Sequence, residues 1–147
     1  MSDDHVAITN LVYAYAERID AGDFDGVAAL LADADVSGEG GNPVRGADAV
    51  RAMYERSTRR YDDDGTPKTK HVTTNLVVEV DSVAGRATCR SYFTVLQAVP
   101  GELALQPIIA GRYHDEFERH ADAWRFSKRH MIPDLIGDLG HHLLFEL

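Results

Sequence analysis

The feature that most constrains the fold is the order of two kinds of segment along the chain. Four runs rich in β-branched and aromatic residues occupy the second half, at residues 71–80, 86–99, 105–119 and 123–132. Because only short turns separate these runs, they predict an antiparallel meander of four strands. The first half is helical in pattern. Helices followed by such strands indicate an α+β domain, with the helices packed on one face of a curved sheet.

Three helices are expected before the strands. The apolar residues of segment 5–20 share one helical face, and they are Ile8, Leu11, Val12, Tyr15 and Ile19. Gly22 suits the end of this helix, and Asp23 can cap the second helix. A third and shorter helix is expected at residues 47–56. All three helices therefore lie in the N-terminal part of the chain.

Loops and a tail make up the rest of the chain. Residues 32–46 contain four glycines and one proline, so only a short strand is expected, at the start of this segment. Residues 57–70 are polar and rich in turn formers, which is typical of an exposed loop. Residues 133–147 are expected to form a short helix or a segment that covers the sheet. Since no repeat or linker divides the chain, residues 1–147 are predicted to form a single domain.

Charge and cysteine content limit the partners and the compartment. The chain has 24 acidic and 15 basic residues, a formal net charge of -9. This balance argues against binding to nucleic acid or to an anionic membrane, because both need basic surfaces. The N-terminus is acidic and has no long apolar run, so we expect no signal peptide. Cys89 is the only cysteine, which excludes an internal disulfide and favours a cytoplasmic location.

No motif for a metal ion or a nucleotide cofactor stands out. His141 and His142 are adjacent, so their side chains diverge on a helix or a strand, and no cysteine pair or HExxH motif is present. The glycines near residue 40 do not follow a strand and open a helix in the way a phosphate-binding loop does. We therefore expect neither a metal nor a cofactor, and the chemistry expected is acid–base chemistry.

Several segments, taken in order, resemble the SnoaL-like branch of the NTF2-like superfamily. They include AGDFDGVAALLAD, KHVTTN and GRYHDEFER, and the similarity spans roughly residues 5–135. The resemblance implies a cone-shaped α+β barrel, with three N-terminal helices packed in a curved antiparallel sheet. It also implies an apolar pocket with an open mouth that holds a small hydrophobic ligand. The superfamily includes dehydratases, isomerases, polyketide cyclases and non-catalytic proteins, so the fold alone does not define the reaction.

Comparison with the scytalone dehydratase family aligns two residues of this chain with catalytic positions of that family. Asp20 falls at the position of that family's pocket aspartate, and His71 falls at one of its catalytic histidines. An imidazole can move protons near neutral pH, and a buried carboxylate can fix its tautomer. The family's second histidine has no equivalent in CRSYFTVLQ, and its asparagine falls near Tyr113. Asp20 therefore has two interpretations, a solvated helix end or a member of a His71–Asp20 pair.

Comparison with the ketosteroid isomerase family favours a different set. Tyr15 falls at that family's oxyanion-hole tyrosine, and Glu39 falls at its general-base aspartate. Asp115 corresponds to its protonated aspartate in one register of the strand. In that enzyme a carboxylate takes a proton and a phenol stabilises the anion that forms. These three residues are therefore predicted to contact the substrate.

Two further tyrosines are expected in the pocket. Tyr54 lies on the inward face of the third predicted helix. Tyr113 shares one face of its strand with Asp115 and Phe117, and this face is the more pocket-like of the two. The strand at residues 86–99 carries apolar residues on both of its faces, so the uncovered face of the sheet is expected to form a homodimer interface.

These observations predict an acid–base lyase, isomerase or cyclase, similar to a dehydratase, that acts on a polycyclic or aromatic molecule. Two alternatives remain open. One is a protein that binds a small apolar ligand without turnover, and the other is a small structural subunit of a ring-hydroxylating dioxygenase. The sequence does not identify the substrate.

Overall fold

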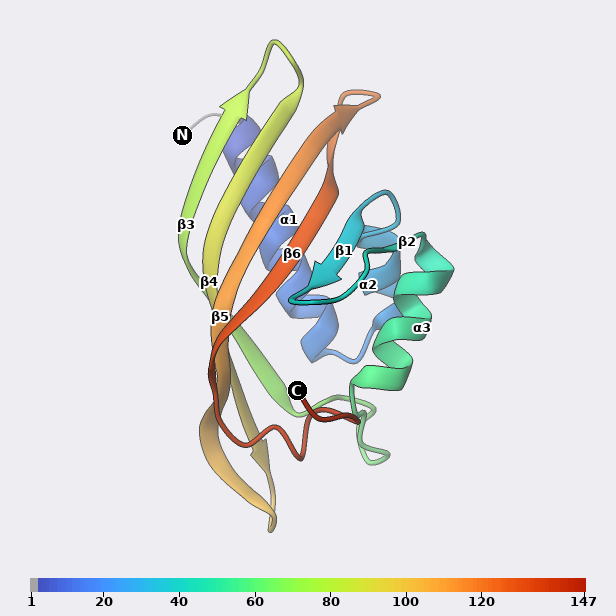
Figure 1. Cartoon of the computed structure of the whole chain (residues 1–147), viewed down its shortest axis with the longest axis vertical. Helices are drawn as coiled ribbons and strands as arrows, with labels where there is room; N and C mark the ends of the chain where they lie inside the picture. The colour runs from blue at the N-terminus through green and yellow to red at the C-terminus, as the bar shows by residue number, and fades with distance from the viewer. Residues whose placement is uncertain (1–2) are drawn as a thin grey trace.

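The computed structural model describes residues 3–147, which form three helices and one curved, open sheet of six strands (Figure 1). In chain order the elements are α1 (Asp3–Asp20), α2 (Phe24–Leu30), β1 (Asp35–Gly38), β2 (Val44–Arg45), α3 (Ala47–Ser57), β3 (Thr69–Asp81), β4 (Arg86–Val99), β5 (Leu103–His120) and β6 (Ala123–Ile136). This order confirms the predicted α+β class, with three helices ahead of the four long strands.

α1 is amphipathic, as the spacing of its apolar residues predicts. Its buried residues are Ile8, Val12, Tyr15, Ala16 and Ile19. The helix ends at Asp20 because Gly22 takes a positive φ of 72°, which glycine adopts without strain. A Cβ at Gly22 would also collide with the backbone oxygen of Gly65. Asp23 caps α2, and its side chain accepts a hydrogen bond from the backbone N–H of Gly26 at 2.8 Å.

The sheet has the strand order β2-β1-β6-β5-β4-β3. β3 to β6 form the antiparallel meander that the sequence predicts. The difference from expectation is that the sheet is mixed, because β1 runs parallel to β6 with Val36 beside Arg129. β1 is the short strand expected at the start of residues 32–46. It covers the edge of β6, whose backbone groups would otherwise be unpaired.

The inner face of the sheet packs against α1, which contacts β3 and β6 (Figure 1). β5 shows how the two faces differ. Tyr113, Asp115 and Phe117 are buried, while His114 and Glu116 between them are exposed. This confirms the inward face predicted for the strand. None of the helices in residues 3–147 has the length and apolar content needed to cross a membrane.

The tail that follows β6 is an irregular segment, and residues 137–147 contain no helix. Backbone hydrogen bonds fix it against the chain that leaves α3. The Arg59 N–H donates to the carbonyl of His142 at 2.8 Å, and the Leu144 N–H donates to the carbonyl of Ser57 at 2.9 Å. Figure 1 shows this dark red segment returning beside the end of α3. Of the two alternatives for the tail, the structure therefore has the covering segment.

Candidate functional site

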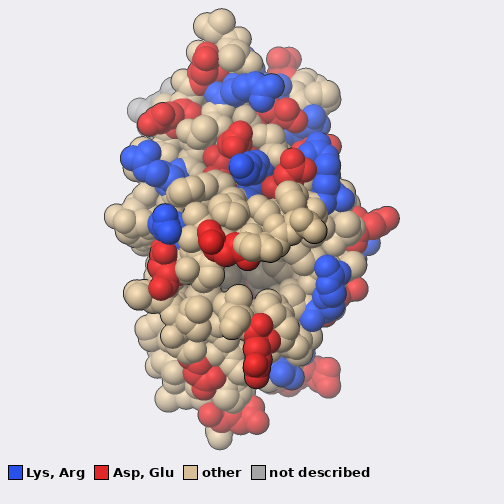
Figure 2. All heavy atoms as spheres, in the orientation of Figure 1, with Lys and Arg blue, Asp and Glu red and all other residues tan. Residues whose placement is uncertain are grey.

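A cavity of about 360 Å³ opens between the inner face of the sheet, α1, α3 and the C-terminal tail. Its volume lies in the range of small-molecule sites. The wall is mainly apolar, with side chains such as Phe93, Ile109 and Met131. Figure 2 shows a hollow in a largely uncharged area near the middle of the face drawn. Polar side chains from distant parts of the chain also line the cavity, and they include Tyr15, Glu39, Tyr54, His71, Tyr113 and His142.

His71, near the start of β3, is bound to Asp20 at the end of α1. The Nδ1 atom of His71 lies 2.6 Å from Oδ1 of Asp20. Oδ2 of Asp20 accepts the backbone N–H of His71 at 2.8 Å, and Oδ1 also accepts the hydroxyl of Thr69 at 2.9 Å. The side chains of His71 and Asp20 are only 7% and 11% exposed. The carboxylate is therefore a buried partner of the histidine and not a solvated helix end.

The surroundings of Asp20 keep its carboxyl ionised. Burial alone raises its pKa, but the hydrogen bonds and charge of His71, with the bond from Thr69, outweigh burial and hold the pKa below its usual value of 3.8. Because an ionised carboxylate can only accept, Nδ1 of His71 carries the shared proton. In the neutral form of the ring the lone pair is therefore on Nε2, to which no group in residues 3–147 hydrogen-bonds. His71 thus presents a base of fixed tautomer at the cavity wall.

Two tyrosine hydroxyls meet at the wall of the same cavity. The hydroxyls of Tyr15 and Tyr54 lie 2.7 Å apart, and the ring of Tyr15 meets the ring of His71 edge-on, with centroids 6.1 Å apart. Burial raises the pKa of both phenols, so both remain neutral at physiological pH. One hydroxyl donates to the other, and the remaining proton of the pair is available to a ligand oxygen.

Behind the tyrosines lies a buried ion pair that the sequence pattern does not predict. The guanidinium of Arg129 donates to both carboxylate oxygens of Asp115, each at 2.9 Å, and both side chains are fully buried. Arg129 lies 3.8 Å from the ring centroid of Tyr113 and 4.4 Å from that of Tyr15. Burial lowers the pKa of Arg129, but attraction to Asp115 outweighs burial and raises it, so the guanidinium stays charged.

This ion pair changes the interpretation of Asp115. Both of its oxygens are taken up by Arg129, and the residue does not line the cavity. Asp115 therefore holds Arg129 against the rings of Tyr15 and Tyr113 and, contrary to expectation, does not itself line the cavity.

Glu39 stands at the mouth of the cavity, just after β1. Its side chain is 61% exposed, and its Oε1 lies 3.6 Å from Nε2 of His130. Within residues 3–147, no hydrogen bond joins Glu39 to Tyr15. The structure thus brings Asp20 and His71 together, whereas it keeps Glu39 at the rim.

A second histidine reaches the cavity from the C-terminal tail. His142 is only 7% exposed, and its ring centroid lies 6.3 Å from that of His71. Burial, helped by repulsion from His71, lowers the pKa of His142 to about 4. The strand at residues 86–99, where the resemblance would place a second histidine, contains none. No local pattern in the tail points to this position, because the contact joins residues far apart in the chain.

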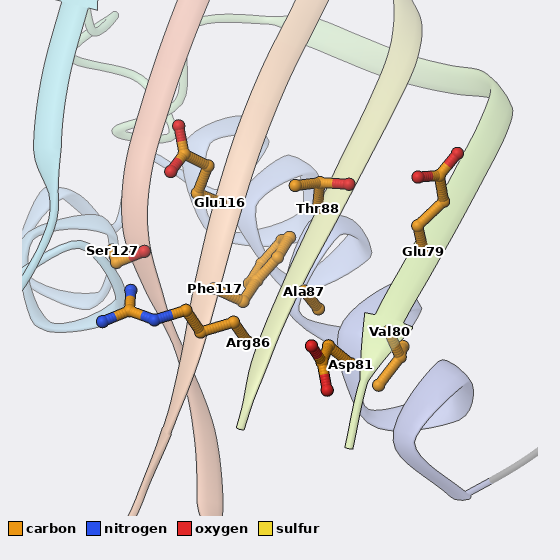
Figure 3. Close-up of a pocket in the computed structure, with 9 residues that line it drawn as sticks. All are labelled: Glu79, Val80, Asp81, Arg86, Ala87, Thr88, Glu116, Phe117 and Ser127. Atoms are coloured by element: carbon orange, nitrogen blue, oxygen red, sulfur yellow. The ribbon is translucent and has the colours of Figure 1, made fainter. Parts of the chain in front are cut away.

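Another hollow, also of about 360 Å³, lies on the outer face of the sheet near the turn between β3 and β4 (Figure 3). Side chains such as Glu79, Arg86 and Glu116 surround it, with α1 on the far side of the sheet. These charged groups are exposed, so water screens them. The inner cavity is the better candidate because its polar groups are buried and oriented.

Comparison with known proteins finds a family model and several solved structures that match this chain. A family model described as SnoaL-like domain matches residues 1–130. The comparison with curated proteins gives no match. Among solved structures, the chain is similar to the Rv3472 protein of Mycobacterium tuberculosis, which is described as of unknown function. The two are 26% identical, with 90% of this chain and 73% of that chain covered and a TM-score of 0.72.

Two other solved structures share the fold at lower identity. An NTF2-like protein with a cystatin-like fold from Novosphingobium aromaticivorans is 20% identical, with 89% of this chain and 82% of that chain covered and a TM-score of 0.72. The LinA-type3 hexachlorocyclohexane dehydrochlorinase of Novosphingobium barchaimii is 22% identical, with 90% and 88% covered and a TM-score of 0.69. Together they confirm the NTF2-like fold.

Proposed function

The chain belongs to the SnoaL-like domain family, and we propose that it is an acid–base enzyme that acts on a small, largely apolar ring compound. His71 serves as the general base, and Asp20 orients the imidazole and stabilises its charged form. The observation that carries this proposal is the 2.6 Å contact between Asp20 and Nδ1 of His71. No group in residues 3–147 hydrogen-bonds Nε2, which is left at the wall of an apolar cavity. A buried base with a fixed tautomer, next to a space for a ligand, is what proton abstraction requires.

The simplest reaction for this arrangement is an elimination. Nε2 of His71 takes a proton from carbon, and the electron pair of the broken C–H bond forms a C=C bond. The leaving group departs with the electrons of its own bond to the neighbouring carbon. When the leaving group is a hydroxyl, the imidazolium returns the proton to it, so water is released and the enzyme is regenerated. If the proton returns to a different carbon, the same residues catalyse an isomerisation.

The tyrosines supply the other half of the chemistry. The Tyr15–Tyr54 pair has one proton left to donate, and this proton can stabilise a substrate oxygen that gains negative charge. The ring of Tyr113 forms part of the wall on which a flat substrate packs. Glu39, at the rim, is positioned to contact polar groups of a substrate near the mouth.

The fold neighbours support this class of reaction. The dehydrochlorinase among them is named for an elimination, which removes a proton and a chloride from neighbouring carbons. The same fold therefore accommodates removal of a proton from carbon. An isomerase or a polyketide cyclase would use the same pair, since both reactions also begin with loss of a proton from carbon.

Proton abstraction can be tested without the natural substrate. We expect the protein to accelerate exchange of the α-protons of 2-tetralone, a bicyclic ketone, in D₂O, as followed by ¹H NMR. The variants His71→Ala and Asp20→Asn should lose most of this acceleration. His120→Gln, a change at the exposed end of β5, serves as the matched control and should behave as the unmodified protein. Binding of the ketone without any exchange would instead support the non-catalytic ligand-binding alternative.

We also propose that the outer face of the sheet forms a homodimer. Val72, Val77 and Tyr92 lie on neighbouring strands of this face and are 40%, 39% and 53% exposed. Large apolar side chains exposed on a sheet face that no helix covers are typical of an interface. Light scattering should give a mass of about twice 16.2 kDa, and Tyr92→Glu should shift it to the monomer value. A monomeric mass for the unmodified protein at micromolar concentration would contradict the proposal.

A further inference from the structure

The imidazole of His142 is buried in the cavity wall, and among residues 3–147 it has no hydrogen-bond partner. Its Nδ1 atom is inaccessible to solvent and unpaired, and no hydrogen bond to either ring nitrogen is found within residues 3–147. A neutral imidazole has one donor and one acceptor. Nδ1 is closed to the cavity as well as to solvent, so Nε2 is the ring nitrogen through which His142 can reach the cavity that it lines. Because buried polar groups in native proteins nearly always have a partner, a ligand that supplies one to Nε2 gains a hydrogen bond.

The position of the ring is fixed by backbone contacts and not by its own hydrogen bonds. The carbonyl of His142 accepts from Arg59 at 2.8 Å, its N–H donates to Leu139 at 3.1 Å, and the neighbouring Leu143 forms a β-bridge with Thr58. The tail therefore holds the ring beside His71, at a centroid distance of 6.3 Å, while both ring nitrogens remain unused. An anchored backbone with a free polar side chain is typical of a ligand-contacting residue.

We propose that His142 contacts the substrate and hydrogen-bonds an uncharged oxygen, a hydroxyl or a carbonyl, beside the carbon that faces His71. The inference rests on the proposed function, since it assumes that the cavity holds the substrate of the His71–Asp20 pair. It adds a residue from the C-terminal tail to the site. It also narrows the substrate class to uncharged ring compounds that carry oxygen.

The preference for an uncharged group follows from the surroundings. Burial and the nearby His71 keep the pKa of His142 at about 4, so the ring stays neutral at physiological pH. It therefore offers no positive charge to an anion. The carboxylate of Asp20, bound to His71 on the neighbouring wall, would repel a carboxylate ligand. A hydroxyl matches a neutral imidazole well, because each group both donates and accepts.

Three probes of the same ring system test this inference: naphthalene, 2-naphthol and 2-naphthoate. Their dissociation constants are measured by NMR titration at about pH 7. We expect 2-naphthol to bind about tenfold more tightly than naphthalene, as one added hydrogen bond implies. We expect 2-naphthoate to bind more weakly than 2-naphthol. His142→Leu should abolish the preference for 2-naphthol, and His142→Gln, which keeps a donor and an acceptor, should restore part of it.

Matched controls separate this inference from the function on which it rests. His141→Leu alters the adjacent histidine, which does not line the cavity, and should keep the preference for 2-naphthol. A preference that persists in His142→Leu overturns the inference but leaves the pocket intact. If none of the probes binds the unmodified protein, the pocket function fails and the inference fails with it. A readout that needs no variant is the ¹⁵N signal of the His142 ring, which 2-naphthol should shift and naphthalene should not.

Discussion

Replacement of His142 by leucine should flatten the dependence of folding stability on pH between about pH 6.5 and pH 4. In the folded chain, burial lowers the pKa of His142 from 6.5 to about 4, and repulsion from His71 adds to the effect. In this window the unfolded chain binds a proton at His142 that the folded chain does not bind. The free energy of unfolding of the unmodified protein must therefore fall as the pH falls.

The size of the effect follows from the shift. A pKa lowered from 6.5 to about 4 corresponds to about 3 kcal/mol when the full window is crossed. Between about pH 7 and about pH 4.5, the linkage relation gives a loss of about 2 kcal/mol from this group alone. Asp20 contributes at more acidic pH, because its folded pKa lies below 3.8. The stabilisation by Asp20 is present above that value and is lost as the pH falls through its lower, folded pKa.

Urea denaturation at a series of pH values from about 7 to about 4.5 measures this difference. The absolute stability of His142→Leu is not the readout, since leucine also changes packing; the readout is the change with pH. This change should be about 2 kcal/mol smaller in His142→Leu than in the unmodified protein. His120→Gln should keep the unmodified slope. Parallel curves for His142→Leu and the unmodified protein would refute the claim that this ring is buried and neutral.

Three further changes test other parts of the structure. Asp20→Asn removes a charged acceptor to which three groups donate hydrogen bonds. The free energy of unfolding, measured by urea denaturation at neutral pH, should therefore fall by about 2 kcal/mol. Unchanged stability would contradict the buried contact. Arg129→Met leaves the buried carboxylate of Asp115 unpaired and should cost about 3–5 kcal/mol, most of which should return when Asp115→Leu is added in a double-mutant cycle. Gly22→Ala should lower the free energy of unfolding by about 1–2 kcal/mol, which corresponds to a fall of several degrees in the melting temperature. Gly40→Ala should have a smaller effect. Both glycines have a positive φ, but a Cβ at Gly22 meets the backbone of Gly65, whereas a Cβ at Gly40 has open space.

The strands show why some inward residues could be predicted and others could not. In β5, strict alternation placed Tyr113 on the inner face, and the structure confirms it. In β6, alternation from Phe126 would turn Lys128 inward. An irregularity in the pairing of β5 with β6 changes the phase, so Arg129 is buried instead. A bulge of this kind leaves no local signal in the sequence, and the ion pair at the centre of the protein was missed for that reason.

The site shows the same limit. Residue pattern alone left Asp20 with two interpretations, and it was the family resemblance that paired it with His71. The structure confirms the contact, while the catalytic role stays a prediction. Neither the residue pattern nor the family resemblance pointed to His142. Its position depends on a backbone hydrogen bond from Arg59 and on the β-bridge between Leu143 and Thr58. The periodicity of a sequence predicts which face of a helix or strand is apolar. It does not predict which part of the protein an irregular tail packs against.

The buried arginine also gives the cavity an electrical direction. Burial raises the pKa of Tyr15 and Tyr54, and the positive charge of Arg129 acts in the opposite sense on both. The negative charge of Asp20 stands beside His71. Asp115 and Asp20 offset part of the effect of Arg129 at Tyr15, whereas Asp20 is the charge in contact with the imidazole. In the proposed reaction, negative charge that develops near the tyrosines while a proton moves to His71 suits this arrangement, and a ligand bound in reverse does not. The interior thus selects the orientation of a reacting dipole before a ligand arrives.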